Sequence, residues 1–171
     1  LVWNMGQPPI EGFTNLGWTL LLALFHLFPF SPAHISLAVM LLAAGLLLTN
    51  TAVIYKIADE LAPSAGTAPL IAAAASAFYF PLVYWTLRGL ETGVLTLCLS
   101  LAVLFALRAG RADSRPGDQW GLALALAGAI LLRMDAALPA GLILLYLAGR
   151  SPRAALVPAL TSVLMLGAIL L

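Results

Sequence analysis

The sequence has little charge and almost no cysteine. Charged residues make up only 9 % of its 171 residues, and the formal net charge is +1. Proteins that bind nucleic acid need clustered positive charge to neutralise phosphates, so we expect no nucleic-acid partner. The single cysteine, Cys98, lies within an apolar run, and it can neither form an internal disulfide bond nor build a metal site alone. We therefore interpret Cys98 as a small buried hydrophobic residue.

Short catalytic motifs are also missing. The sequence contains no glycine-rich phosphate loop, no zinc-binding signature and no nucleophile elbow. Its two histidines, His26 and His34, have no second ligand at metal-binding spacing, so we interpret both as residues at a membrane interface. The cofactor is unknown from the sequence, and a requirement for a divalent metal stays open.

Apolar sequence is what the chain has in abundance. Hydrophobic residues make up 63 % of it, and the mean hydropathy is +1.04, whereas a soluble domain is usually about 45–50 % apolar. Crossing the hydrocarbon core of a bilayer takes about 20 residues. The apolar runs that we expect to form spans are residues 34–57, 67–87 and 90–107, the shorter runs 120–132 and 136–148, and a last run from about residue 154. The predicted fold class is an all-α, polytopic transmembrane helical bundle with about five full or nearly full spans.

The first part of the chain has a different composition. Residues 1–15 mix aromatic residues, prolines and glycines with one carboxylate, Glu11, which is typical of an ordered loop. The apolar run 16–28 is too short to cross a membrane, so it predicts an interfacial helix. We divide the chain into an extracytoplasmic loop with a juxtamembrane helix (1–33) and a transmembrane helical bundle (34–171). The sequence starts at Leu1 without an initiator methionine, and its last apolar run stops without a polar flank, so we expect the chain to be a piece of a longer protein.

Positive charge falls in every second connection between the expected spans. These residues are Lys56, Arg108, Arg111, Arg115, Arg150 and Arg153. The positive-inside rule assigns such connections to the cytoplasmic side. The other connections carry Arg88 and Glu91, and then Arg133 and Asp135, so we expect these four residues on the extracytoplasmic face. Glu11 is expected on the same face because the run 16–28 does not cross.

These polar residues allow two interpretations. Glu91 begins a span, where the helix dipole stabilises a carboxylate, and Arg88 lies one turn earlier, so the two could form a simple interfacial ion pair. Alternatively, the arginine and the carboxylate line a pocket for a polar, anionic ligand, because a guanidinium binds phosphate in a fork geometry. The same pairing of residue types at Arg133 and Asp135 favours a shared cavity. Glu11, alone in its loop, would ordinarily be a solvated surface residue.

Small and polar residues inside the spans predict how the helices pack. Gly93 and Ser100 fall largely on one face of a helix, and Gly121 and Gly128 do the same on the next. In lipid, such faces allow two helices to approach closely. The polar triplet 49–51 is expected to form an interhelical hydrogen bond.

Three segments resemble a known family. Residues 1–15, LVWNMGQPPIEGFTN, with the WTLL of residues 18–21, resemble the stretch GLVWNPGE-PVEGYTN-LWTLLLA of bacterial GT-C type membrane glycosyltransferases, which include the terminal arabinofuranosyltransferases of mycobacterial cell-wall synthesis. Residues 84–93 resemble the family segment YW-x-x-x-GLET-P, with Gly93 where the family often has proline. Residues 132–136, LRMDA, resemble the segments LTRPEG and LRPDG.

The resemblance implies an enzyme of the bacterial cytoplasmic membrane with its site on the extracytoplasmic face. It would move a sugar from a polyprenyl-phosphate-linked donor to a glycan or lipid acceptor, among membrane lipids. The catalytic base of such enzymes is an aspartate in the first extracytoplasmic loop, which would lie upstream of Leu1, so no residue of this chain is expected to be catalytic. Arg88 and Arg133 would neutralise the departing lipid phosphate. The residues expected to orient the sugar hydroxyls or the loop are Glu11, Glu91 and Asp135.

Two other function classes compete with this one. A multi-pass transporter or lipid flippase could use the same polar residues to bind substrate at one gate. A membrane scaffold without catalytic activity would need them only as helix-end charges. The sequence does not decide which sugar or acceptor the parent protein would use.

Overall fold

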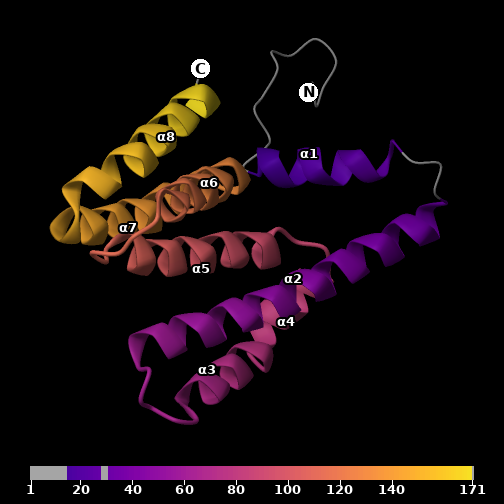
Figure 1. The fold of residues 1–171 in the computed structure, drawn as a ribbon. Helices are drawn as coiled ribbons and strands as arrows, with labels where there is room; N and C mark the ends of the chain where they lie inside the picture. The colour runs from indigo at the N-terminus through magenta and orange to yellow at the C-terminus, as the bar shows by residue number, and fades with distance from the viewer. Residues whose placement is uncertain (1–14, 28–30, 171) are drawn as a thin grey trace.

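A computed structural model describes residues 15–27 and 31–170, and nearly all of these residues are helical (Figure 1). The elements are α1 (Leu16–Phe25), α2 (Pro32–Leu61), α3 (Ala68–Ala77), α4 (Phe80–Leu87), α5 (Thr92–Ala109), α6 (Pro116–Leu132), the 3-10 helix η1 (Met134–Ala136), α7 (Ala137–Arg150) and α8 (Pro152–Leu170). The described residues contain no strand. The expected all-α class is therefore correct for this part of the chain.

Three described helices are long and apolar enough to cross a membrane. They are α5, α8 and the segment His34–Leu61 of α2, and a fourth span results if α3 and α4 count as one broken span. Several such helices in one chain indicate a multi-pass membrane protein. The number is lower than the expected five because α6 has 17 residues and α7 has 14. α1, with ten residues, is also too short to cross, in agreement with the expectation for the run 16–28.

The span expected over residues 67–87 is not a single helix. The helix breaks between α3 and α4, whose axes differ by 47°. Pro81 occupies the first turn of α4, and Tyr79 before it has an extended backbone (φ −71°, ψ 94°). In a continuous helix, the proline ring would clash with the carbonyl group of Ala77, and the hydrogen bond to that carbonyl would be lost. Proline is tolerated in a first turn, so the chain starts a new helix there.

The first span is longer than expected at its C-terminal end. We expected this span to end at residue 57, but α2 continues through Leu61 and takes Asp59 and Glu60 into the helix. Proline disfavours a helical backbone in the residue before it, and the helix ends just ahead of Pro63. Glu60 can remain in a helix of this bundle because it forms ion pairs, described below.

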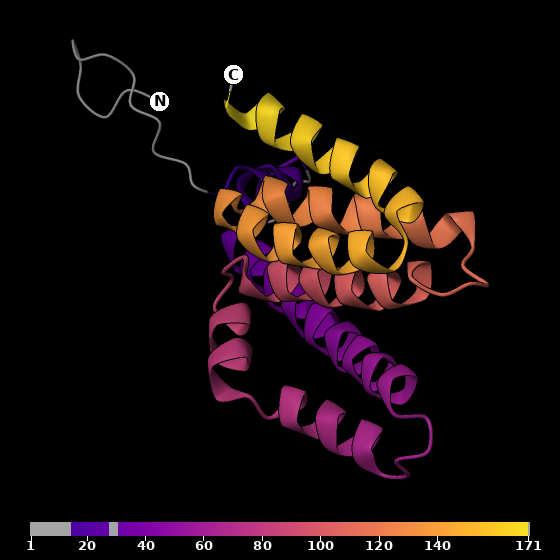
Figure 2. The same cartoon turned by 90° about the vertical axis from the view of Figure 1, so that its left-hand side faces the viewer.

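The helices form two groups on either side of α2. Figures 1 and 2 show α5, α6, α7 and α8 packed on one side of α2, and α3 and α4 on the other. The core lies among α5 to α8, where large buried side chains pack with alanines. The fully buried aliphatic residues there include Leu122, Leu126, Ile130 and Leu147.

α5 and α6 approach each other closely at the positions of small residues. A Cβ atom added at Gly121 would lie 2.7 Å from Cζ of Phe105, and one added at Gly128 would lie 3.4 Å from Sγ of Cys98. The ring of Phe105 therefore occupies the space that a side chain at position 121 would need. The prediction of close helix approach on this face is confirmed, and it is the packing that lipid favours.

The polar triplet of α2 also behaves as expected at its centre. Asn50 is only 2 % exposed, and its Nδ2 atom donates a hydrogen bond to Oγ of Ser76 on α3, at 3.3 Å. The hydroxyl groups of Thr49 and Thr51 donate to carbonyl groups of their own helix. The predicted interhelical hydrogen bond is confirmed, and it joins α2 to α3.

Candidate functional site

The candidate site lies at the end of the bundle where α5 begins and α6 ends. These two helices are consecutive and antiparallel, so Glu91, just before α5, meets Arg133, just after α6. Asp135 follows in η1. The structure thus brings together three of the predicted site residues, although Arg133 and Asp135 lie 42 and 44 positions after Glu91 in the sequence.

Arg133 is held between two carboxylates. Its Nη1 atom lies 3.3 Å from Oε1 of Glu91. Its Nε and Nη2 atoms donate to the two carboxylate oxygens of Asp135 at 3.0 and 2.8 Å, which is the bidentate fork geometry. Hydrogen bonding and charge from Asp135, with a smaller contribution from Glu91, raise the pKa of Arg133 above its usual value. The guanidinium therefore stays charged across the physiological range.

Local backbone geometry explains this cluster of Glu91, Arg133 and Asp135, which we call the acidic cluster. Arg133 is extended (φ −151°, ψ 125°) between α6 and η1, so its side chain can turn back to Asp135 two residues later. The cluster carries one positive and two negative charges. The side chain of Glu91 is 12 % exposed, whereas that of Asp135 is 66 % exposed. The acidic cluster is thus a net-negative surface that can offer carboxylate oxygens to the hydroxyl groups of a ligand.

α1 is fastened beside the acidic cluster. The indole N–H of Trp18 donates to the carbonyl oxygen of Gly89 at 3.0 Å, and Trp18 is 4 % exposed. Nδ2 of Asn15 lies 3.5 Å from Oε2 of Glu91. A Cβ atom at Gly17 would lie 2.9 Å from the carbonyl oxygen of Leu131, so α1 approaches the backbone of α6 directly. Sequence reasoning missed Trp18 and Asn15 as contacts of the site, although an indole in an apolar run needs a hydrogen-bond acceptor when it is buried.

Of the two interpretations of Arg88 and Glu91, the simple ion pair between them does not form in the described structure. Arg88 is the residue that ends α4, and its guanidinium carbon lies 4.7 Å from the centre of the Tyr84 ring, one turn earlier on the same helix. Gly89 then takes a positive φ of 83°, and the chain turns before Glu91. Because this backbone conformation separates the end of α4 from the start of α5, Arg88 and Glu91 face different neighbours. The guanidinium of Arg88 makes a cation–π contact with Tyr84 instead of an ion pair with Glu91.

Arg88 lines a cavity of about 410 Å³ that lies between α1, the first turns of α2 and the end of α4. We call it the Arg88 cavity. The residues that line it are Leu22, His26, Ile35, Ser36, Val39, Met40, Leu87, Arg88 and Gly89. His26 and Arg88 are both exposed. A cationic group therefore stands at the edge of a hollow whose walls are otherwise mostly apolar.

Glu11, the remaining predicted site residue, lies outside the described residues. His34 contacts Oγ of Ser31 through Nδ1 at 2.9 Å. Within the part of the chain that the structure describes, no group of three or more histidine, cysteine, aspartate or glutamate residues could hold a metal ion.

A second ionic cluster lies at the opposite end of the bundle. Oε1 of Glu60, near the end of α2, lies 2.6 Å from Nε of Arg108, and Oε2 lies 3.1 Å from Nη2 of Arg111. We call Glu60, Arg108 and Arg111 the basic cluster. It borders a cavity of about 290 Å³ that also includes Arg115 and Asp118. Three of the arginines expected to share one side of the membrane, Arg108, Arg111 and Arg115, thus lie together at one end of the bundle.

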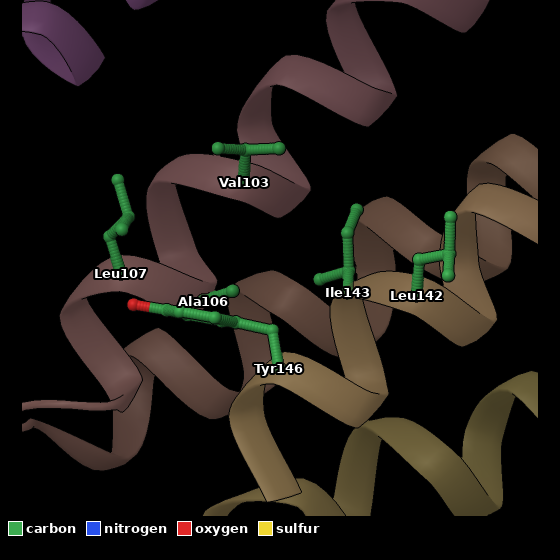
Figure 3. Close-up of a pocket in the computed structure, with 6 residues that line it drawn as sticks. All are labelled: Val103, Ala106, Leu107, Leu142, Ile143 and Tyr146. Carbon is green, nitrogen blue, oxygen red and sulfur yellow. The ribbon is translucent and has the colours of Figure 1, made fainter. Parts of the chain in front are cut away.

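The cavity between α5 and α7 provides a contrast. It measures about 250 Å³, and the side chains that line it, shown in Figure 3, are apolar apart from the hydroxyl of Tyr146. The other lining residues are Val103, Ala106, Leu107, Leu142 and Ile143. This cavity contains no charged group, so we do not consider it a candidate site for chemistry on a polar substrate.

No protein-family model, curated protein or solved structure matches the chain. The resemblance of three segments to GT-C type glycosyltransferases therefore remains a prediction.

Proposed function

We propose that the chain is part of an integral-membrane glycosyltransferase that moves a sugar from a polyprenyl-phosphate donor to an extracytoplasmic glycan or lipid acceptor. The observation that supports this best is the position of the acidic cluster next to the Arg88 cavity. One part offers carboxylate oxygens suited to sugar hydroxyls, and the other offers a cation suited to phosphate. Both parts include residues of the segments that resemble the family, 84–93 and 132–136.

The geometry revises the roles that the resemblance implies for the two arginines. Three nitrogen atoms of Arg133 already contact carboxylate oxygens, so Arg133 is better suited to hold Glu91 and Asp135 in position than to bind phosphate. Arg88 forms no ion pair with any described residue. We assign phosphate binding to Arg88, and positioning of the carboxylates to Arg133.

In the proposed reaction, the oxygen of an acceptor hydroxyl forms a bond with the anomeric carbon of the donor sugar. The bond between that carbon and the phosphate oxygen breaks, and the lipid phosphate leaves with the electron pair. A carboxylate base outside residues 1–171 takes the proton of the hydroxyl. Arg88 stabilises the negative charge on the leaving phosphate, while Glu91 and Asp135 orient the sugar.

The test is a transfer assay with the complete protein that contains this chain, reconstituted in vesicles with a polyprenyl-phosphate sugar and a glycan acceptor. We expect Arg88→Gln and Glu91→Gln each to lower the rate by about 100-fold, since removing one electrostatic contact to a transition state has effects of that order. The matched controls are Arg115→Gln and Asp113→Asn, which change the same charges at the other end of the bundle and should keep the wild-type rate. Wild-type rates for both Arg88→Gln and Glu91→Gln would refute the assignment.

A lipid flippase or transporter is the second candidate, and the break between α3 and α4 favours it. Discontinuous helices are a feature of many transporter sites, and here the 47° break lies near the buried Asn50, whose Oδ1 atom has no hydrogen-bond partner in the described part. The same vesicles decide between the two functions. Movement of a fluorescent polyprenyl phosphate across the bilayer, without any sugar transfer, would favour the flippase.

A further inference from the structure

A second hollow adjoins the Arg88 cavity along α2. It measures about 280 Å³ and lies between α2, α3 and α4, next to the break at residues 78–79. Leu87 lines both hollows. On α2, Met40 lines the first and Ala44, one turn further along, lines the second. The two hollows together follow α2 from Ile35 to Thr51, a length of about 24 Å at the rise of an α-helix.

We propose that these two hollows form one groove that binds a lipid with a phosphate head and a single hydrocarbon chain. The head lies against Arg88 and His26, and the chain follows α2 beneath α4. The proposal deepens the proposed function, because it names the part of the site that holds the donor lipid and the residues that recognise it.

Charge and polarity change along the groove in the order that such a lipid requires. The Arg88 cavity contains a guanidinium and an imidazole and is lined by no carboxylate among the described residues. The ring of Tyr84 supports the guanidinium from one face, which limits its freedom before a ligand arrives. An anionic head is therefore favoured at this end.

The second hollow is suited to hydrocarbon. Its only polar side chains are Thr51 and Ser76, and both hydroxyl groups already have partners. Oγ1 of Thr51 donates to the carbonyl of Leu47, and Oγ of Ser76 accepts the hydrogen bond from Asn50. The remaining surface is aliphatic. Its volume is at the small end for ligand pockets, so it fits a segment of one chain rather than the two acyl chains of a phospholipid.

The groove ends beside the acidic cluster. Gly89 lines the Arg88 cavity, and Glu91 follows two residues later at the start of α5. A phosphate bound at Arg88 would thus present the group attached to it toward the turn that leads to Glu91. A lipid-linked sugar needs a binding site for its phosphate next to a binding site for its hydroxyl groups, and the Arg88 cavity and the acidic cluster would provide the two.

Binding is measured directly by native mass spectrometry of the complete protein in detergent, titrated with undecaprenyl phosphate. Undecaprenol tests the contribution of the phosphate, and phosphatidylglycerol tests whether any anionic lipid binds. We expect the affinity to follow the order undecaprenyl phosphate, then undecaprenol, with phosphatidylglycerol weakest. Arg88→Gln should lower the affinity for undecaprenyl phosphate by about tenfold, because one charge-assisted contact is lost. The affinity for undecaprenol should be unchanged.

Ala44→Trp fills the second hollow and should weaken both polyprenyl lipids. Its matched control is Ala127→Trp, which fills the separate apolar hollow between α6 and α8 and should leave binding unchanged. If Ala44→Trp fails to fold, Met40→Cys gives a second measurement, because bound undecaprenyl phosphate should slow alkylation of that cysteine. Equal affinity for phosphatidylglycerol and undecaprenyl phosphate would overturn the proposed lipid groove. So would an unchanged affinity of Arg88→Gln for undecaprenyl phosphate.

The binding and transfer assays fail in different ways. If undecaprenyl phosphate binds specifically and its binding depends on Arg88, but the protein transfers no sugar, the proposed lipid groove stands and the proposed glycosyltransferase function is wrong. If sugar transfer depends on Glu91 but lipid binding is unaffected by substitutions at Arg88 and Ala44, the proposed glycosyltransferase function stands and the proposed lipid groove is wrong.

Discussion

The two ionic clusters at the ends of the bundle have opposite arrangements of charge. In the acidic cluster, Arg133 lies between the carboxylates of Glu91 and Asp135. In the basic cluster, Glu60 lies between Arg108 and Arg111. The first has a net charge of −1 and the second a net charge of +1. This difference has the sign that the positive-inside rule expects if the basic cluster faces the cytoplasm.

The clusters also differ in how well the most buried charge is compensated. Glu60 is 14 % exposed and has two arginines within ion-pair distance, so its negative charge is offset twice, although its buried Oε2 atom accepts no hydrogen bond from the described residues. Glu91 is 12 % exposed and shares its one arginine with Asp135. A carboxylate with two cationic partners is suited to hold helices together. Two carboxylates that share one cation leave one negative charge uncompensated, which can attract the hydroxyl groups of a ligand, and this is why we place the candidate site at the acidic cluster.

The largest effect that we expect on stability comes from Arg133→Leu. It leaves Glu91, whose side chain is only 12 % exposed, without a cation and near a second carboxylate, so the free energy of unfolding should fall by about 2 kcal/mol. Thermal or denaturant unfolding in detergent measures this. The raised pKa of Arg133 means that its contribution is present at all pH values below the usual arginine pKa, so the loss should be the same at pH 6 and pH 8.

Arg108→Leu is the matched variant in the basic cluster. Glu60 keeps its contact with Arg111, so we expect a smaller loss of stability than for Arg133→Leu. If Arg108→Leu destabilises the protein more, then the pairing is not more complete at Glu60, and the comparison between the two clusters is wrong.

An intermediate effect is expected from Trp18→Phe, which tests the attachment of α1 beside the acidic cluster. The variant loses the hydrogen bond to the carbonyl of Gly89, which should lower stability by about 1 kcal/mol. It should also make α1 more susceptible to limited proteolysis. Trp120→Phe is the control, because Trp120 is 57 % exposed and lies at the other end of the bundle. Equal proteolysis of α1 in both variants would show that the indole does not hold α1.

The smallest effect is expected from Asp135→Asn. Asp135 is 66 % exposed, and exposed ion pairs contribute little, so the free energy of unfolding should change by less than about 0.5 kcal/mol. The same unfolding measurement checks this. A change as large as that of Arg133→Leu would mean that the exposed bidentate pair with Asp135 contributes more to stability than the more buried pair with Glu91.

Much of the fold could be predicted from the sequence because apolar runs and charged connections mark helices and their ends. The expected boundaries of α5 and α7 lie within two residues of the observed ones. The break before α4 could have been found as well, since Pro81 lies inside the run that we expected to be continuous. The extension of α2 could not, because it depends on partners of Glu60 that are 48 and 51 residues away.

The candidate site was predictable in its members but less so in its contacts. Glu91, Arg133 and Asp135 do meet, as expected because the connections that carry them alternate with the positively charged ones. Sequence spacing could not decide whether Arg88 pairs with Glu91, because it does not reveal the turn at Gly89, where a positive φ sends the two sides of the junction in different directions. The contact of α1 with this junction depends on Trp18 and Gly17. The hydrophobic pattern alone does not reveal which residues of the other helices these two positions contact.

The contact between α1 and α6 limits which substitutions this helix can accept in related proteins. Position 17 has no room for a side chain against Leu131, and position 18 must supply an N–H group to a backbone oxygen. Leu20 and Leu24 are 54 % and 56 % exposed, so other apolar residues can replace them freely. Sequence variation along α1 should therefore be concentrated on its outer face, while a glycine followed by a tryptophan persists on the inner one.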